Sequence, residues 1–150
     1  MIPLLVLCGT WVAVGVISGL ISADWNRSWG LALRVALTTM FAFTAWSHFS
    51  RRTRSDLIRM VPPSLGAPGA WVTLTGFLEA AGAIGLLIPR LSALAATCLA
   101  LLLVALFPAN VHAARTGVTI AGRKVPAIGP RLALQILWIA LLLWVRDARM

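Results

Sequence analysis

Five long apolar runs dominate the sequence, and they constrain its fold more than any other feature. They cover residues 2–21, 30–49, 71–88, 91–107 and 132–145. A helix needs about 20 mostly apolar residues to cross the hydrocarbon core of a bilayer, and there only helices and closed barrels satisfy their own backbone. The alternating pattern of a membrane barrel is absent from these runs. The sequence therefore predicts an all-α, polytopic membrane helix bundle with five spans.

The composition agrees with this class of protein. Hydrophobic residues make up 60% of the chain, charged residues only 11%, and the mean hydropathy is +0.92. The linkers between the runs are short and polar or basic, which leaves no room for a soluble domain. We therefore expect residues 1–150 to form a single transmembrane helical domain. The first run lacks the basic start of a signal peptide and exceeds the usual length of its apolar part, so we interpret it as a retained helix.

The net charge of +9 predicts lipid contacts and an orientation, not nucleic-acid binding. The cations flank the spans, where they meet anionic headgroups and set topology. With five spans, one side would carry eight of the thirteen cations, namely Arg51, Arg52, Arg54, Arg59, Arg115, Arg123, Lys124 and Arg131. Positive charge favours the cytoplasmic side. We therefore expect membrane lipids as partners, the N-terminus inside and the C-terminus outside.

Glu79 is the only glutamate, and it lies inside the third apolar run. An acidic residue at the centre of a membrane helix costs about 2.5–3.5 kcal/mol on insertion scales. Small residues surround it at helical spacing, including Gly76 and Gly82, so a neighbouring helix can come close. Glu79 should thus face protein. A structural ion pair, a ligand or proton role, and a neutral carboxyl all remain open.

The second run has its own polar stripe, in which Arg34, Thr38 and His48 share one helical face. Lipid would penalise both ionisable residues, so this face should point into the bundle. The two candidate partners of Glu79 are therefore Arg34 and His48. A structural ion pair between Arg34 and Glu79 would neutralise both charges without any ligand.

Further polar residues lie at the same predicted membrane half. Pro108 cannot donate to the carbonyl of Val104, so the fourth helix should kink or break there, beside Asn110 and His112. The fifth run opens with Arg131 and Gln135 on one face. Four runs thus send polar groups to the cytoplasmic half. The sequence predicts a ligand-binding pocket there, lined by His48, Glu79, Asn110, His112 and Gln135.

The sequence gives only weak signals for a metal site and for a redox role of its cysteines. Two imidazoles and a carboxylate form a known zinc set, but His48, His112 and Glu79 have no local spacing signature, and we predict no metal site. Cys8 and Cys98 both fall inside apolar runs and form no CxxC pair. We interpret each cysteine as a small buried hydrophobe.

The linker at residues 51–65 mixes cations with apolar residues. That mixture predicts a short amphipathic surface helix, which Pro62 and Pro63 would end.

An ordered set of these residues resembles the DoxX family of small bacterial membrane proteins. The set comprises Arg34, His48-Phe49, Met60-Val-Pro62, Gly76-Phe-Leu-Glu79 with Gly85 and Pro89, Phe107-Pro-Ala-Asn110, and Arg131-Leu-Ala-Leu-Gln135. The resemblance implies a four-helix core in the bacterial inner membrane, here with an extra N-terminal span. It also implies that Arg34, His48, Glu79, Asn110 and Gln135 occupy the family's recurring polar positions. Some members are quinone-linked or redox-associated subunits, which suggests a bound quinone or lipid and a redox partner subunit.

Two functions from different classes follow from this reading. In the first, the bundle binds a lipophilic molecule such as a quinone and serves a redox reaction. In the second, it is a non-catalytic scaffold or assembly subunit whose polar cluster only holds helices together, and a homo-oligomer is compatible with either. The sequence holds no nucleophile–base–orienter triad, which favours an accessory subunit over a stand-alone enzyme.

Overall fold

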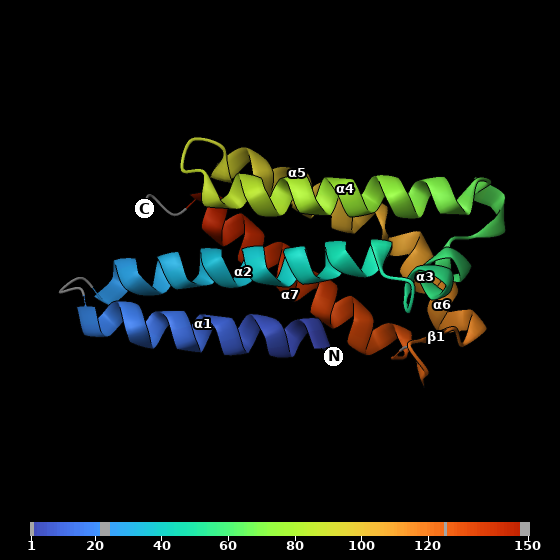
Figure 1. Ribbon diagram of the computed structural model, residues 1–150, viewed down its shortest axis with the longest axis horizontal. Helices are drawn as coiled ribbons and strands as arrows, with labels where there is room; N and C mark the ends of the chain where they lie inside the picture. Colours follow the sequence, from blue (N-terminus) through green and yellow to red (C-terminus); the bar gives the residue numbers. More distant parts are fainter. Residues whose placement is uncertain (1, 22–24, 125, 148–150) are drawn as a thin grey trace.

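The computed structural model describes residues 2–21, 25–124 and 126–147, and most of this chain is helical (Figure 1). The long helices are α1 (Ile2–Ile21), α2 (Trp25–Phe49), α4 (Pro68–Leu87), α5 (Ser92–Ala105) and α7 (Ile128–Asp147). The shorter elements are α3 (Arg54–Met60), the 3-10 turn η1 (Pro63–Leu65), α6 (Phe107–Thr116), β1 (Thr119–Ile120) and β2 (Arg123–Lys124). Apart from one two-stranded hairpin, the predicted all-α class is confirmed.

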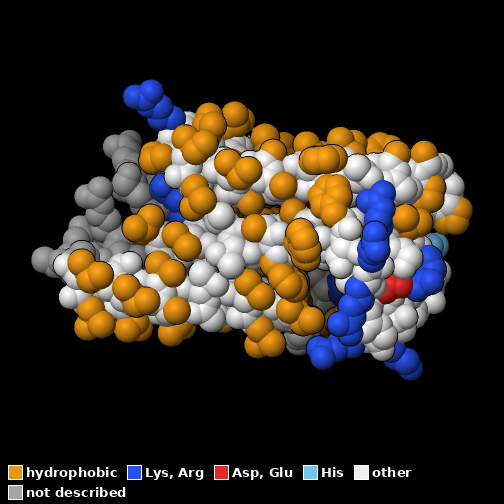
Figure 2. All heavy atoms as spheres, viewed as in Figure 1, with side chains coloured by type: hydrophobic (Ala, Val, Ile, Leu, Met, Phe, Trp, Pro, Cys, Tyr) orange, Lys and Arg blue, Asp and Glu red, His pale blue; other side chains and the backbone are white. Residues whose placement is uncertain are grey.

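Five helical segments of the described chain are long and apolar enough to cross a membrane, with Ser92–Thr116 counted as one segment. They coincide with the five apolar runs, although most extend beyond the predicted ends. Large apolar side chains also cover the outside of these helices, as Figure 2 shows for one face. A membrane protein presents such a surface because its solvent at that level is hydrocarbon.

Helix α2 lies at the centre of the bundle, between α1 and α4, and α5 packs against both α4 and α7 (Figure 1). The core forms where these helices meet, from side chains such as Leu37 and Met40 of α2, Leu99 of α5 and Leu142 of α7. Helix α1 is peripheral, because only Leu7 and Gly15 of its residues are buried.

Small residues allow the helices to approach one another. A Cβ atom added at Gly15 of α1 would lie 2.3 Å from the Trp29 ring of α2. On α4, a Cβ at Gly82 would lie 2.5 Å from Leu99, and one at Gly85 would lie 2.8 Å from Ala95, both in α5. The face of α4 that the sequence marked as small is therefore buried in protein contacts, as predicted.

The predicted break in the fourth span is confirmed, two residues before Pro108. Helix α5 ends at Ala105, Leu106 forms a turn, and α6 starts at Phe107. A proline lacks the N–H that would continue the ladder, so Pro108 is tolerated only in the first turn of the new helix.

The linker between the fourth and fifth apolar runs, residues 108–131, is not an irregular loop. The segment contains α6 and the hairpin of β1 and β2, whose turn places Ala121 and Gly122 at φ values of 49° and 78°. Two positive φ values are typical of the tight turns that match strand twist. Asp56 of α3 supports the turn, since its Oδ2 accepts a 2.8 Å hydrogen bond from the Ala121 N–H. Strands of two residues are too short to show an alternating hydrophobic pattern, so the sequence did not predict this hairpin.

Two further expectations have different outcomes. The linker 51–65 contains the predicted short helix, α3, which ends before Pro62 and Pro63. Cys8 and Cys98 are both exposed on the bundle, so the prediction that they are buried was wrong. Outward and inward positions of a membrane helix are equally apolar, so an apolar run does not reveal which side a cysteine faces.

Candidate functional site

Glu79 lies near the middle of α4 and is only 5% exposed. Gly76, one turn earlier, makes room for α2, since an added Cβ there would lie 2.7 Å from the Cβ of His48. The close approach of the two helices brings the His48 ring over the carboxyl group. Glu79 Oε2 lies 3.6 Å from His48 Nε2. The predicted contact between Glu79 and His48 is thus present, and Glu79 is shielded by protein.

The other ring nitrogen of His48 has a defined role. Nδ1 lies 2.8 Å from the carbonyl oxygen of Val72 and 3.3 Å from the hydroxyl of Thr75. A carbonyl oxygen only accepts, so Nδ1 must carry a hydrogen. Nε2 faces Glu79 Oε2 at 3.6 Å, which is an ion-pair distance when the imidazole is protonated and is too long for a hydrogen bond.

The Glu79 carboxyl is incompletely satisfied. Its Oε2 is buried and has no hydrogen-bond partner in the described chain, because His48 lies beyond hydrogen-bond distance. The Thr44 hydroxyl, one turn before His48 on α2, lies near this carboxyl but donates to the carbonyl of Phe41 at 3.0 Å. Most buried polar atoms in proteins are paired, so an unpaired carboxyl oxygen marks a place where another group can bind.

The predicted ion pair between Arg34 and Glu79 is not formed. No carboxylate of the described residues lies within 4 Å of Arg34, and the ion pair of Glu79 is with His48. Arg34 precedes Thr44 by ten residues on α2, which is about 15 Å along the helix axis. A shared helical stripe places two residues on one face but says nothing of their depth relative to a neighbouring helix. The second helix therefore meets Glu79 with only one of its two ionisable residues.

Asn110 and Gln135 form a second cluster, between α6 and α7. Asn110 Nδ2 donates to Gln135 Oε1 at 3.2 Å, and Arg131 Nη2 donates to Asn110 Oδ1. Gln135 Nε2 in turn donates to the carbonyl of Leu103 at 2.9 Å. That carbonyl belongs to the last helical turn before the break at Leu106, so Gln135 caps backbone at the interruption.

The five predicted site residues therefore form two contact groups and not one continuous cluster. His48 pairs with Glu79, and Asn110 pairs with Gln135, but no hydrogen bond or ion pair of the described residues joins the two groups. His112 is half-buried, and its backbone carbonyl accepts a 2.8 Å hydrogen bond from the Thr116 hydroxyl. Nor do the described residues include a group of three potential metal ligands, so His48, His112 and Glu79 do not meet. The ligand role of these residues stays a prediction.

Arg54, which was predicted only as a cation at the lipid interface, also belongs to the site. Its Nη1 donates to the carbonyl of His48 at 2.9 Å, and its Nη2 donates to the Thr73 hydroxyl at 2.7 Å and to the carbonyl of Gly69. The guanidinium thus ties the end of α2 to the start of α4 beside the His48–Glu79 pair. Its position five residues after the end of α2, where cations can satisfy free carbonyls, was the available signal.

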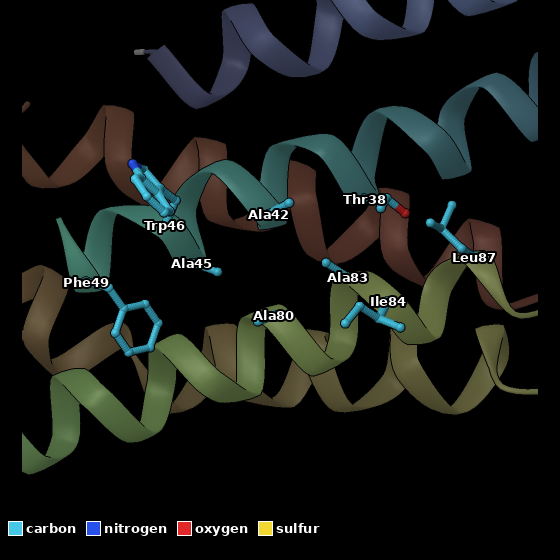
Figure 3. A pocket seen from close by; sticks show the side chains of 9 residues that line it. All are labelled: Thr38, Ala42, Ala45, Trp46, Phe49, Ala80, Ala83, Ile84 and Leu87. Carbon is cyan, nitrogen blue, oxygen red and sulfur yellow. The ribbon is translucent and has the colours of Figure 1, made fainter.

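An apolar groove of about 440 Å³ runs between α2 and α4 on the outside of the bundle (Figure 3). Alanines from both helices form much of its lining, with Trp46 and Phe49 towards one end and Thr38 and Leu87 towards the other. Glu79 and His48 are not among the lining residues, although their neighbours Ala80 and Phe49 are. A second hollow near Trp71, of about 400 Å³, is also apolar.

Comparison with known proteins gives a family but no activity. No curated protein and no solved structure matches the chain. One family model matches residues 37–146, which include the His48–Glu79 pair and the Asn110–Gln135 cluster and leave out α1. Since this match covers more than half of the sequence, the chain belongs to the family described as a domain of unknown function, DUF8561.

Proposed function

We propose that the protein is a DoxX-like, redox-associated membrane subunit that binds the polar head of a lipophilic molecule, such as a quinone, at the His48–Glu79 pair. The observation that carries this proposal is the buried Oε2 of Glu79, which has no hydrogen-bond partner in the described chain. A carboxyl group in a low-dielectric site gains strongly from any donor or acceptor that reaches it.

The chemistry of the pair suits a quinone head. A quinone carbonyl accepts hydrogen bonds, and a protonated carboxyl group at Glu79 or an imidazolium at His48 is a donor that matches it. Thr44 and Thr75 add hydroxyl groups on the two facing helices. The electrons for any redox reaction would come from a partner subunit, so the role of this chain is to bind and position. We therefore place it as an accessory subunit of a larger membrane assembly.

A short-tailed benzoquinone is expected to raise the unfolding temperature of the detergent-solubilised protein. In Glu79→Gln and His48→Ala its dissociation constant should rise about tenfold or more, because a hydrogen bond to a buried charged group contributes about 1.5–3 kcal/mol. Thr97→Val is the matched control, since the exposed Thr97 hydroxyl bonds only within its own helix. An equal thermal shift in wild type and both site variants would contradict the proposal.

A non-catalytic scaffold is the second candidate, and the Asn110–Gln135 cluster favours it. There the polar groups bond to one another and to Leu103, which satisfies them without a ligand. Such networks hold membrane helices together. Two results together would favour the scaffold function over quinone binding. Quinones would leave the unfolding temperature unchanged, and the site variants would disrupt assembly with partner proteins or with copies of this chain.

We also propose an orientation in the bacterial inner membrane, with the N-terminus and the α3 end in the cytoplasm. Exposed cations gather around α3, α6 and the hairpin, at the right-hand end of Figure 2, among them Arg51, Arg52, Arg115 and Arg123. A C-terminal reporter that is active only in the cytoplasm should stay silent, and the same reporter at the N-terminus should be active. The opposite pattern would show that the topology is reversed.

A further inference from the structure

Arg34 is a buried cation whose counter-charge is missing from the described chain. The residue is 7% exposed, its Nε has no hydrogen-bond partner, and no described carboxylate lies within 4 Å of it. The three described acids have other partners, since Asp56 pairs with Arg59, Glu79 with His48, and Asp147 with Arg146. The fourth acid, Asp24, lies outside the described residues. An arginine stays charged in proteins, so burial of an unpaired one strongly favours an anion.

Thr38, one helical turn after Arg34 on the same side of α2, is a second unsatisfied group. Its hydroxyl oxygen is buried and has no hydrogen-bond partner in the described residues. Other threonines of the spans bond to their own helix, as Thr39 does to the carbonyl of Val35 at 2.9 Å. Thr38 also lines the apolar groove between α2 and α4, at the end that is nearer to Arg34 (Figure 3).

The dimensions of the groove suit a hydrocarbon chain. Thr38 and Phe49, the lining residues at the two ends of the α2 side, are eleven residue steps apart, which is about 16 Å of helix rise. The lining is apolar except for Thr38, with a volume of about 440 Å³. The apolar segment of α2 that is long enough to span a membrane starts at Trp29, five positions before Arg34 and about 7.5 Å away along the axis. A long arginine side chain at that depth can reach the headgroup level.

We propose that this groove is a binding site for an anionic phospholipid, with the phosphate at Arg34 and Thr38 and an acyl chain along the groove towards Phe49. The guanidinium group presents paired N–H donors that match a phosphate, and the Thr38 hydroxyl supplies a further donor. The alanine floor, with Ala42, Ala45 and Ala80, leaves room for methylene groups. The site is separate from the His48–Glu79 pair and does not rest on the function proposed for it.

Purified protein in mild detergent, titrated with phosphatidylglycerol, phosphatidylcholine of the same chains, or inorganic phosphate, tests the proposal. Native mass spectrometry counts bound lipid, and thermal unfolding reports its effect. Phosphatidylglycerol should bind wild type about tenfold more tightly than phosphatidylcholine, and this preference should be lost in Arg34→Gln and reduced in Thr38→Val. Ala42→Leu narrows the groove and should weaken both lipids. Arg90→Gln, which removes an exposed cation, should behave as wild type.

Each alternative has its own outcome. Equal binding of the two lipids, or an unchanged preference in Arg34→Gln, overturns the proposal. If inorganic phosphate alone reproduces the stabilisation, Arg34 binds free phosphate and the lipid assignment is wrong. If Asp24→Asn and Arg34→Gln lower stability equally and their costs are not additive, the counter-charge of Arg34 is Asp24 and the lipid-site proposal is wrong.

If Arg34→Gln does not fold, the lipid preference and lipid affinity of Thr38→Val and Ala42→Leu test the proposal instead. Quinone binding by Arg34→Gln is measured separately and should equal that of wild type, because the lipid site does not include the His48–Glu79 pair.

Discussion

Truncation of Glu79 to alanine is expected to destabilise the solubilised protein by about 3 kcal/mol or more, because loss of one member of a buried ion pair leaves the other unsatisfied. His48→Ala should cost a comparable amount, since it removes both the Nε2 contact to Glu79 and the Nδ1 hydrogen bond to the Val72 carbonyl. The double variant should lose much less than the sum of the two. The measurement is a double-mutant cycle, built from the free energies of unfolding of the four proteins in denaturant titrations in detergent.

Arg34→Gln supplies the matched control for that cycle. Arg34 has no contact with Glu79, so its cost should add to that of Glu79→Ala within about 0.5 kcal/mol. Additive costs for His48 and Glu79, or strong coupling of Glu79 to Arg34, would contradict the arrangement described above. The first result would mean that the 3.6 Å contact contributes nothing to folding.

A methyl group at Gly76 is expected to separate α2 from α4 and to lower stability by about 1–3 kcal/mol, the usual cost of overpacking a core. The new Cβ would lie 2.7 Å from the Cβ of His48 and 3.0 Å from the Phe49 ring. The Phe49 ring can rotate, but the Cβ of His48 is bonded to the backbone and cannot move away without moving α2. The intrinsic gain of alanine in a helix, roughly 0.5–1 kcal/mol, offsets only part of this cost.

Gly9→Ala is the control for Gly76→Ala. Gly9 also lies inside a helix, but an added Cβ there meets nothing within 4 Å. This variant should be neutral or slightly stabilising in the same denaturant titration. A neutral Gly76→Ala would show that the two helices do not approach as closely as described. A destabilised Gly9→Ala would show that glycine is needed for reasons other than packing.

Much of the fold was predictable from hydrophobicity alone. The five spans follow from the length of the apolar runs, since a bilayer leaves the backbone of such a run few alternatives to a helix. The break before Pro108 and the end of α3 before Pro62 follow from the missing proline N–H. The burial of Glu79 follows from the cost of a carboxyl group in lipid and from the glycines around it.

The division of the candidate site into two clusters was not predictable. Helical spacing shows which residues share a face, and rise per residue shows how deep they lie, but neither shows which helix faces which. His48 meets Glu79 because Gly76 lets α2 and α4 come into contact at that level. Asn110 meets Gln135 because α6 starts after the break and packs on α7. Arg34 lies on the expected stripe and yet too far along α2 to reach Glu79.

The sequence by itself determined that this chain is a bundle of membrane helices and that its few ionisable residues inside the spans must be shielded from lipid. Both follow from transfer free energies, which depend on residue type and run length. Only the tertiary structure decided the partners: His48 for Glu79, Gln135 for Asn110, and none in the described chain for Arg34. Partner choice depends on how closely two helices approach and at what relative height, and this is settled by side-chain packing between segments distant in sequence.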